Sequence, residues 1–84
     1  MENNSVFKVI DYGRVVFNIL PIMKEKNMSV TQVVKRTGLH HLVVNRYCSG
    51  NAVRYDGETL AKLCFVLDCN ISDIMNYEKP IKKD

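Results

Sequence analysis

The sequence lacks a long apolar run, and no stretch approaches the roughly 18 consecutive apolar residues that a membrane-spanning helix needs. Its first residues also lack a basic region followed by an apolar run and a small-residue cleavage site, the pattern of a secretory signal. Eighty-four residues, 46% of them hydrophobic, suffice for one domain with a modest core. We therefore expect a cytoplasmic protein of one domain that does not associate with a membrane.

The sequence has three cysteines, Cys48, Cys64 and Cys69, but no C-x-x-C pair. An odd number without such a pair indicates neither a disulfide framework nor a zinc site, so we expect reduced thiols. Cys64 and Cys69 are expected to pack inward as small core residues. For Cys48, a redox switch is an alternative interpretation, with only Arg46 nearby to lower its pKa.

The sequence also lacks a Gly-rich phosphate loop and a recognisable set of nucleophile, base and oxyanion donors. Asp68 and Asp73 fall at expected helix boundaries, where Asp commonly serves as a cap. His40 and His41 are adjacent, but neighbouring helical residues point about 100° apart, and no Cys or His stands four residues away. We therefore expect no enzymatic activity, no metal site and no cofactor.

Acidic residues are missing from one long stretch of the chain. Between Lys26 and Tyr55 there is no Asp or Glu, but there are five basic residues, namely Lys26, Lys35, Arg36, Arg46 and Arg54. Such a stretch favours attraction to the phosphates of a nucleic acid, because each neutralised phosphate releases condensed counterions. The alternative interpretation is an ordinary solvated charged surface.

Within this basic stretch, residues 29–50 are typical of two short helices joined by a tight turn at residues 37–39. Ser29 is a suitable N-cap for a helix over residues 30–37, since its hydroxyl can accept a hydrogen bond from a first-turn amide. One side of that helix is apolar at helical spacing, with Val30, Val33 and Val34. Gly38 follows where a left-handed residue is needed to end the helix.

A second helix is predicted over residues 40–49, and Gly50 ends it by the same logic as Gly38. Its apolar series runs at intervals of three and four residues through Leu39, Val43, Val44 and Tyr47. The opposite side then carries His41, Leu42, Asn45 and Arg46. Two short helices with a Gly-containing turn form the arrangement that places a second helix in the major groove of DNA.

Several short motifs carry a family resemblance, in chain order NMS, KRTGL, NR, SGN and ETLAKLCFVLDCNISDIMNY. From Asn18 to Tyr77 the chain resembles the helix-turn-helix domains of the lambda repressor and Cro superfamily (Xre type). The resemblance implies a mainly α, five-helix DNA-binding domain whose helix at residues 40–49 reads the major groove. The candidate DNA-binding residues are Ser29, Lys35, Arg36, His40, His41, Leu42, Asn45, Arg46, Asn51 and Arg54.

Three positions depart from the pattern of this family. Val30 stands where many members have a Gln that touches phosphate, and Val34 where a small Ala is usual. His40 replaces the Ser that often caps the second helix, and an imidazole is expected to be a poorer cap. Because of these departures, the sequence predicts no particular operator.

Residues 1–17 read as an N-terminal extension that forms a short β-hairpin. The runs VFKVI and RVVF favour strands, and Gly13 between them supplies the positive φ of the loop. The alternative of one long helix from residue 11 is disfavoured by Pro21, which fits better in the first turn of a helix over residues 19–26 capped by Asn18. The hairpin would either cover its own core or pair through its edge with a second subunit.

The remaining helices are expected within the domain at residues 18–77. Asp56 can cap a helix over residues 57–67, and Asn70 can cap a last short helix over residues 71–75, whose Ile71, Ile74 and Met75 would close the core. After Tyr77, residues 78–84 are expected to form a polar, basic tail.

Two functional hypotheses follow. The first is a sequence-specific DNA-binding transcriptional regulator, a small repressor that binds double-stranded DNA as a homodimer at paired half-sites. The second is a helix-turn-helix scaffold that contacts a protein partner, as an antirepressor or an antitoxin-like protein does, through an apolar spot at Leu42 and Val43.

Overall fold

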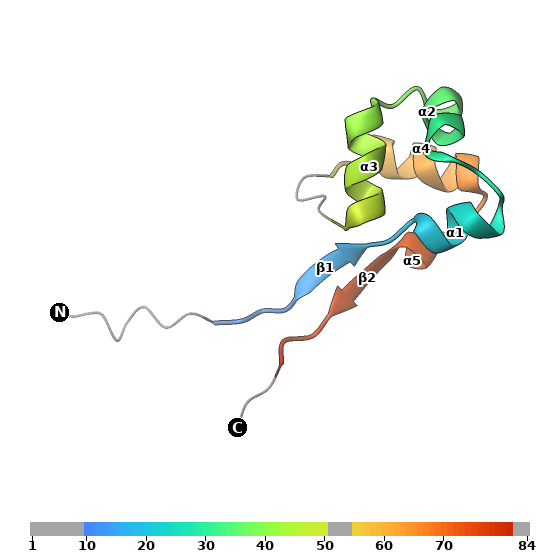
Figure 1. The fold of residues 1–84 in the computed structure, drawn as a ribbon. Helices are drawn as coiled ribbons and strands as arrows, with labels where there is room; N and C mark the ends of the chain where they lie inside the picture. The colour runs from blue at the N-terminus through green and yellow to red at the C-terminus, as the bar shows by residue number, and fades with distance from the viewer. Residues whose placement is uncertain (1–9, 51–54, 82–84) are drawn as a thin grey trace.

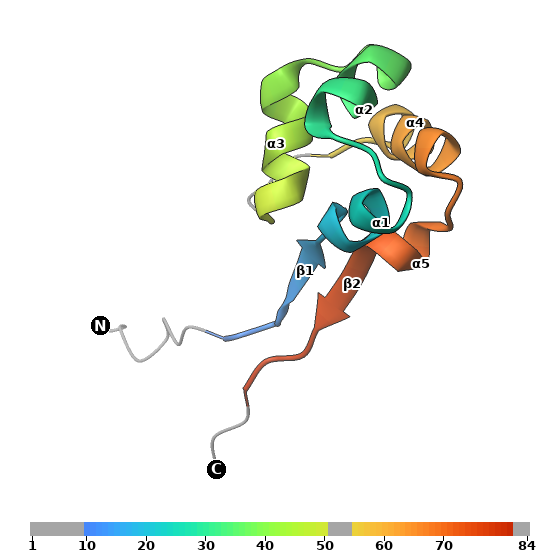
Figure 2. The same cartoon turned by 45° about the vertical axis from the view of Figure 1, so that its right-hand side comes forward.

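A computed structural model of the chain describes residues 10–50 and 55–81. Along the chain these residues form strand β1 (Arg14–Phe17), helices α1 (Leu20–Glu25), α2 (Val30–Thr37), α3 (His41–Ser49), α4 (Gly57–Leu67) and α5 (Ile71–Ile74), and strand β2 (Met75–Glu78). The helices pack together into one body, and the two strands extend from it as a narrow arm (Figures 1 and 2). The predicted mainly α fold with five helices is confirmed, and a small antiparallel sheet of β1 and β2 accompanies the helices.

The core lies where the helices meet the inner end of the sheet. Each of the five helices contributes at least one buried apolar side chain, because each has an apolar stripe at helical spacing. The core residues are Phe17, Ile19, Met23, Val33, Val44, Tyr47, Leu60, Leu63, Leu67 and Ile74. This core holds α2 and α3 in a fixed relation, with α4 packed against α2.

Helix α1 begins later than predicted, and Asn18 is not its cap. The N-cap is Ile19, and Pro21 falls in the first turn, where its missing amide costs little, as predicted. The backbone N–H of Asn18 donates to the Ile74 carbonyl at 2.9 Å. Asn18 therefore continues the link between the two strands instead of starting the helix.

The strand at residues 14–17 exists, but its partner is not the predicted one. β1 pairs antiparallel with β2 at the C-terminal end of the domain, with Arg14 opposite Glu78 and Phe17 opposite Met75. Most of the other predicted strand, residues 6–10, lies outside the described residues. The pairing with β2 anchors β1 on the helices, because α5 runs without a break into β2.

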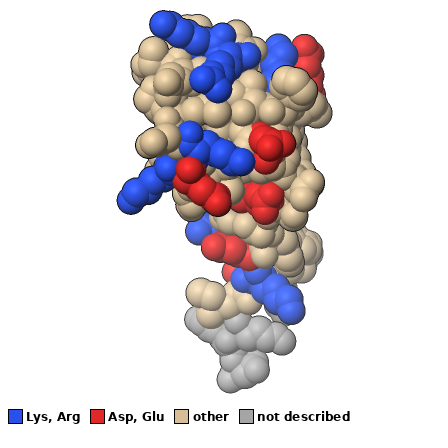
Figure 3. Space-filling model, turned by 90° about the vertical axis from the view of Figure 1, so that its right-hand side faces the viewer, with Lys and Arg blue, Asp and Glu red and all other residues tan. Residues whose placement is uncertain are grey.

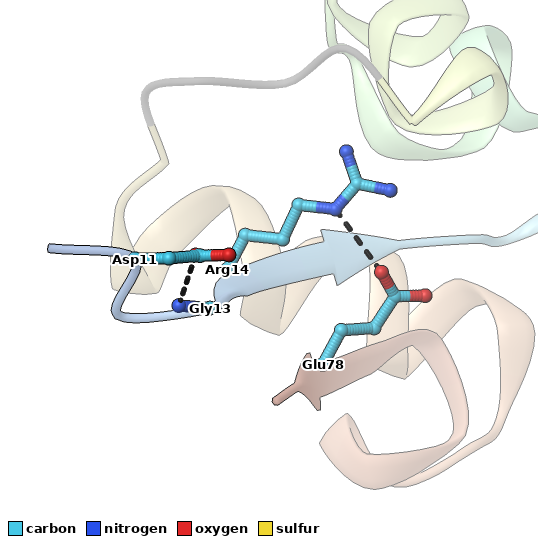
Figure 4. Close-up of polar contacts among 4 residues, drawn as sticks. All are labelled: Asp11, Gly13, Arg14 and Glu78. Atoms are coloured by element: carbon cyan, nitrogen blue, oxygen red, sulfur yellow. Dashed lines mark hydrogen bonds and ion pairs between the residues drawn. The ribbon is translucent and has the colours of Figure 1, made fainter. Parts of the chain in front are cut away.

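The outer end of the sheet is closed by short polar contacts (Figure 4). The Asp11 carboxylate accepts a hydrogen bond from the Gly13 amide at 2.9 Å, which forms a turn before β1. Gly13 has φ of 80°, the positive value that the sequence predicted for this position. Across the sheet, Arg14 Nε lies 3.0 Å from Glu78 Oε1.

Helix α4 ends in a left-handed residue that is not glycine. Asp68 has φ of 52°; its amide donates to the Phe65 carbonyl, and the amide of Cys69 donates to the Cys64 carbonyl at 3.0 Å. These two bonds make a Schellman motif, in which the side chains at Cys64 and Cys69 are expected to meet. Both cysteines pack against the core, as predicted.

Both predicted cap residues of the last two helices are found at N-cap positions, with Asn70 before α5. Asp56 occupies the N-cap position of α4, but its side chain accepts no hydrogen bond from the helix. Before α5, the Asp73 carboxylate accepts from the Asn70 amide at 2.8 Å. The last helix is also shorter than predicted, because Met75 already belongs to β2, and β2 extends to Glu78 in the segment expected as tail.

Within residues 10–50 and 55–81, none of the helices is both long enough and apolar enough to cross a membrane.

Candidate nucleic-acid interface

The first helix of the helix-turn-helix pair is fixed by a reciprocal cap. Ser29 Oγ accepts from the Gln32 amide at 3.2 Å, and Gln32 Oε1 accepts from the Ser29 amide at 2.9 Å. This capping box satisfies two amides that a helix start leaves unpaired. Because Ser29 Oγ acts here as an acceptor, its hydroxyl hydrogen is left available as a donor to an anion.

The turn between α2 and α3 is built by one buried hydroxyl. Thr37 Oγ1 donates to the Val33 carbonyl at 2.7 Å and accepts from the Leu39 amide at 3.1 Å. Gly38 has φ of 76°, in the left-handed region that ends α2 as predicted. The turn is therefore held from both sides, which sets the angle at which α3 leaves α2.

An imidazole caps α3. His40 is the N-cap, and its Nδ1 accepts from the Leu42 amide at 3.1 Å, so the imidazole does perform the capping that a Ser performs elsewhere. An accepting Nδ1 places the ring proton on Nε2 in neutral His40. That N–H is a donor at the positive end of a helix, where an anion is favoured.

The buried side of α3 follows the predicted stripe, with Val44 and Tyr47 in the core. The predicted opposite side is largely exposed, and Leu42 is 58% exposed there despite its apolar side chain. We call His41, Leu42, Asn45 and Arg46 the reading face of α3. The structure therefore brings all four predicted base readers together on one helix.

Two members of the reading face are bonded to each other. Asn45 Nδ2 lies 3.1 Å from His41 Nδ1, one helical turn away. If the amide donates, the free Oδ1 and the second N–H of Asn45 remain for another partner, which is the pair that an adenine edge requires. The contact thus restricts the Asn45 rotamer before any ligand arrives.

An open hollow lies beside the reading face, between α1 and α3. It is lined by Leu20, Leu42, Asn45, Arg46, Cys48 and Ser49. Behind it, Cys48 Sγ contacts Met23 Sδ at 3.7 Å. Burial raises the pKa of the Cys48 thiol, which disfavours the alternative of a redox switch at this residue.

Basic side chains are exposed on both α2 and α3. Lys35 and Arg36 stand exposed in the last turn of α2, where the helix dipole favours a cation. Neither they nor Arg46 forms an ion pair with an acid in the part of the chain that the structure describes. On the face shown in Figure 3, Lys and Arg lie at the top, in the middle and toward the lower end of the molecule, with acids interspersed among them.

Two predicted contacts, Asn51 and Arg54, lie outside the described residues. Among the residues that are described, no group of three His, Cys, Asp or Glu side chains is arranged to hold a metal ion. The arrangement suits recognition of a charged polymer through hydrogen bonds, and the candidate residues described here come from α2, the turn and α3 alone.

The comparison with known families decides what kind of domain this is. Residues 18–80 match the model of the Cro/C1-type helix-turn-helix DNA-binding domain. The chain belongs to the Cro/C1-type helix-turn-helix family. This confirms the resemblance drawn from the sequence motifs, and it makes the protein a DNA-binding domain of that family. No curated protein sequence matches the chain.

Two solved structures share the Cro/C1-type fold of this chain. One is a presumed DNA-binding protein from Bacteroides fragilis, with a TM-score of 0.66, 17% identity, and coverage of 75% of this chain and 100% of that one. The other is the transcriptional regulator VanUg, with a TM-score of 0.65, 18% identity, and coverage of 95% and 100%. At such low identity the likeness concerns the fold.

Sequence reasoning missed two residues that position the interface. Gln32 completes the capping box with Ser29, and the spacing S-x-x-Q is a readable signal for it. Thr37 was assigned to the turn, but its buried hydroxyl bridges Val33 and Leu39, which depends on the final packing and has no local sequence signal.

Proposed function

We propose that this Cro/C1-type protein is a sequence-specific transcriptional repressor that binds double-stranded DNA as a homodimer, with α3 in the major groove. The observation that carries the proposal is the reading face of α3. Four side chains able to contact base edges stand together on one helix, and the opposite side of that helix is locked into the core. A helix held in this way presents its side chains at a fixed depth and angle.

Each member of the reading face has a role that its chemistry suits. His41 and Leu42 lie nearest the N-terminus of α3, the part that enters the groove most deeply, and Leu42 suits a thymine methyl group. Asn45, oriented by His41, suits an adenine edge. Arg46 lies a turn further on, where its guanidinium reaches either a guanine or a phosphate.

Contacts with the phosphate backbone would set the register of α3 on the duplex. The donors proposed for this role are the hydroxyl of Ser29, the Nε2–H of His40 and the cations of Lys35 and Arg36. Asn51 and Arg54 are proposed as further phosphate contacts, on the family resemblance. Repression would follow from occupation of a promoter by the bound dimer.

The Arg46→Ala variant tests the assignment of the reading face. Arg46 is exposed and forms no ion pair with a described acid, so the variant should keep the stability of the wild type. Its DNA affinity should fall by about 10- to 100-fold, the loss expected for one base or phosphate contact of a guanidinium. The measurement is fluorescence anisotropy with a selected operator duplex.

The matched control is Lys79→Ala, which removes the same charge from an exposed residue just after β2. It should retain the wild-type affinity to within about twofold, since a distant exposed charge is screened at physiological salt. Equal losses in both variants would contradict the assignment and indicate attraction by net charge alone.

A second function is favoured by one observation, the exposure of Leu42 beside an open hollow that also includes Leu20. An apolar spot of this kind also suits a protein partner, as expected for an antirepressor or antitoxin-like scaffold. Leu42→Asp separates the two functions. The scaffold would be favoured if the wild type binds no DNA specifically and Leu42→Asp loses a protein partner that the wild type binds.

A further inference from the structure

The apolar face of the sheet continues beyond the helices that cover its inner end. The register places Val15 opposite Tyr77, on the same face of the sheet as Phe17 and Met75. Phe17 belongs to the core, and Met75 packs against it. Phe17 is buried, whereas Val15 is 42% exposed and Tyr77 is 59% exposed. We call Val15 and Tyr77 the outer sheet face.

The opposite face of the sheet has a different character. Apart from half-buried Val16, it carries the polar side chains of Arg14, Asn76 and Glu78. The charges of Arg14 and Glu78 neutralise each other across the strands (Figure 4). An arm with water on both sides gains nothing from placing its apolar residues on one face, so this segregation indicates that the outer sheet face is covered.

Tyr77 is fixed in place before any contact forms. Its hydroxyl donates to the Tyr12 carbonyl at 2.6 Å. Its ring lies against Gly13, where an added Cβ would stand 2.8 Å from Tyr77 Oη, so the close approach needs a residue without a side chain. A tyrosine held in this way loses little conformational entropy on association, which is typical of the anchor residues of interfaces.

We infer that a second copy of this chain covers the outer sheet face, with the two sheets packed face to face about a two-fold axis. A two-fold axis brings the same patch to both sides of the contact, so a self-complementary apolar face is what it requires. The chain carries a net charge of +3, which repels a second copy, but Val15 and Tyr77 bear no charge and the neighbouring Arg14 is already paired with Glu78.

The available area fits a weak dimer. Two further exposed aromatic residues lie next to the outer sheet face: Tyr12, whose carbonyl accepts from the Tyr77 hydroxyl, and Tyr55, whose ring centroid lies 5.0 Å from that of Phe17. Together with Val15 and Tyr77 they offer roughly 500 Å² per protomer, or about 1,000 Å² for the pair, at the lower limit for a specific interface. The dimer should therefore depend on protein concentration and form more completely on paired half-sites.

This interface would also set the distance between the two reading helices, and in that respect it rests on the proposed function. The C-terminal end of α3 lies against β1. The approach is close, because a Cβ atom added to Gly50, the residue that ends α3, would lie 3.4 Å from the Phe17 carbonyl oxygen. Two sheets packed together would hold the two copies of α3 at one spacing, which selects operators with half-sites about 34–36 Å apart or a multiple of that.

Analytical ultracentrifugation of the full chain without DNA tests the interface over a range of concentrations. The wild type should pass from monomer to dimer as its concentration rises. Val15→Lys should weaken the dimer by at least about tenfold, because it buries an unpaired charge in the contact. The matched control is Phe65→Ser on α4, which removes an 86% exposed aromatic side chain elsewhere on the molecule and should leave the dimer unchanged.

Three results would overturn the inference: a wild type that stays monomeric at every concentration, a Val15→Lys dimer as strong as the wild-type dimer, or a dimer lost in Phe65→Ser. An NMR dilution series of the wild type checks the surface without relying on a variant that folds. Its concentration-dependent shifts should centre on Val15 and Tyr77, and shifts centred on α4 would contradict the inference.

The ultracentrifugation contains no DNA, so its result does not depend on the proposed function. Together with a separate measurement of DNA binding, it separates the two proposals. A dimer through the outer sheet face that binds no DNA would refute the proposed function and leave the interface standing. A monomer that binds single half-sites through α3 would overturn the interface and the homodimer, and would leave DNA recognition by α3 standing.

Discussion

His40 shows how a single side chain sets the start of α3. The family often has Ser at this cap, and an imidazole was expected to be a poorer one, yet His40 Nδ1 accepts a hydrogen bond from the backbone amide of Leu42 in the structure. The sequence-based reasoning compared residue types, whereas the bond depends on the rotamer of one ring. The reading face was predictable for a different reason, since helical spacing alone separates the buried Val44 and Tyr47 from Leu42.

Cys69 gives a prediction at the residue scale. Burial, then the neighbouring Cys64 thiol and Asp73, raise the pKa of Cys69 to about 11, with Lys26 acting the other way. Relative to an ordinary value of 9.0, this leaves roughly 100-fold fewer thiolates at pH 8, and the thiolate is the reactive form. Iodoacetamide should therefore label Cys69 about 100-fold more slowly in the folded protein than in urea.

Mass spectrometry of the labelled peptide reads out the rate at each pH. The folded rate should keep rising as the pH increases toward 11, whereas the unfolded rate should level off above 9. A raised folded pKa also means that the stability contribution of the protonated thiol is fully present below pH 9 and is lost as the pH rises through 11. Equal labelling rates in the two states would contradict the buried thiol.

At the scale of elements, α2, α3 and α4 were predictable because their signals are local. Ser29 and Gly38 bracket one helix, and Gly50 ends the next, each within a few residues of the segment that it limits. Strand β2 was not predictable in this way. Glu78 of β2 pairs with Arg14 of β1, which lies 64 residues away in the sequence. In addition, a four-residue strand with a single alternating pair, Met75 and Tyr77, is too short to give a periodic signal.

The capping box of α2 gives a prediction at this scale. Ser29→Ala removes the acceptor for the Gln32 amide and should cost about 1 kcal/mol of folding free energy. In a domain of this size that lowers the Tm by about 4–8 °C, as measured by circular dichroism. Thr31→Ala, an exposed change in the same helix, is the control and should leave the Tm unchanged or slightly higher.

If Ser29 also donates to a phosphate, as proposed, Ser29→Ala should weaken DNA binding at temperatures where the variant is fully folded. An unchanged Tm would contradict the cap, and an unchanged affinity would remove Ser29 from the interface.

For the whole molecule, the structure joins two parts that the sequence suggested separately. The helical body carries the reading face, and the arm of β1 and β2 that extends from this body carries the outer sheet face (Figure 1). The sequence analysis placed the strand at residues 14–17 in an N-terminal hairpin, because pairing between strands that lie far apart in the sequence produces no local sequence pattern. In the structure that strand supplies Phe17 to the core, which ties the arm to the helices.

The central claim is that α3 reads a DNA sequence, and one measurement tests it most directly. Duplexes are selected from a random-site pool with the wild-type protein, and fluorescence anisotropy then gives their affinity at two salt concentrations. We predict enrichment of a repeated half-site. A dimer that contacts about six phosphates should lose roughly a thousandfold in affinity between about 50 and 200 mM salt. Weak binding without any enriched sequence would contradict the claim, because the basic residues would then attract phosphate without the reading face of α3 selecting a sequence.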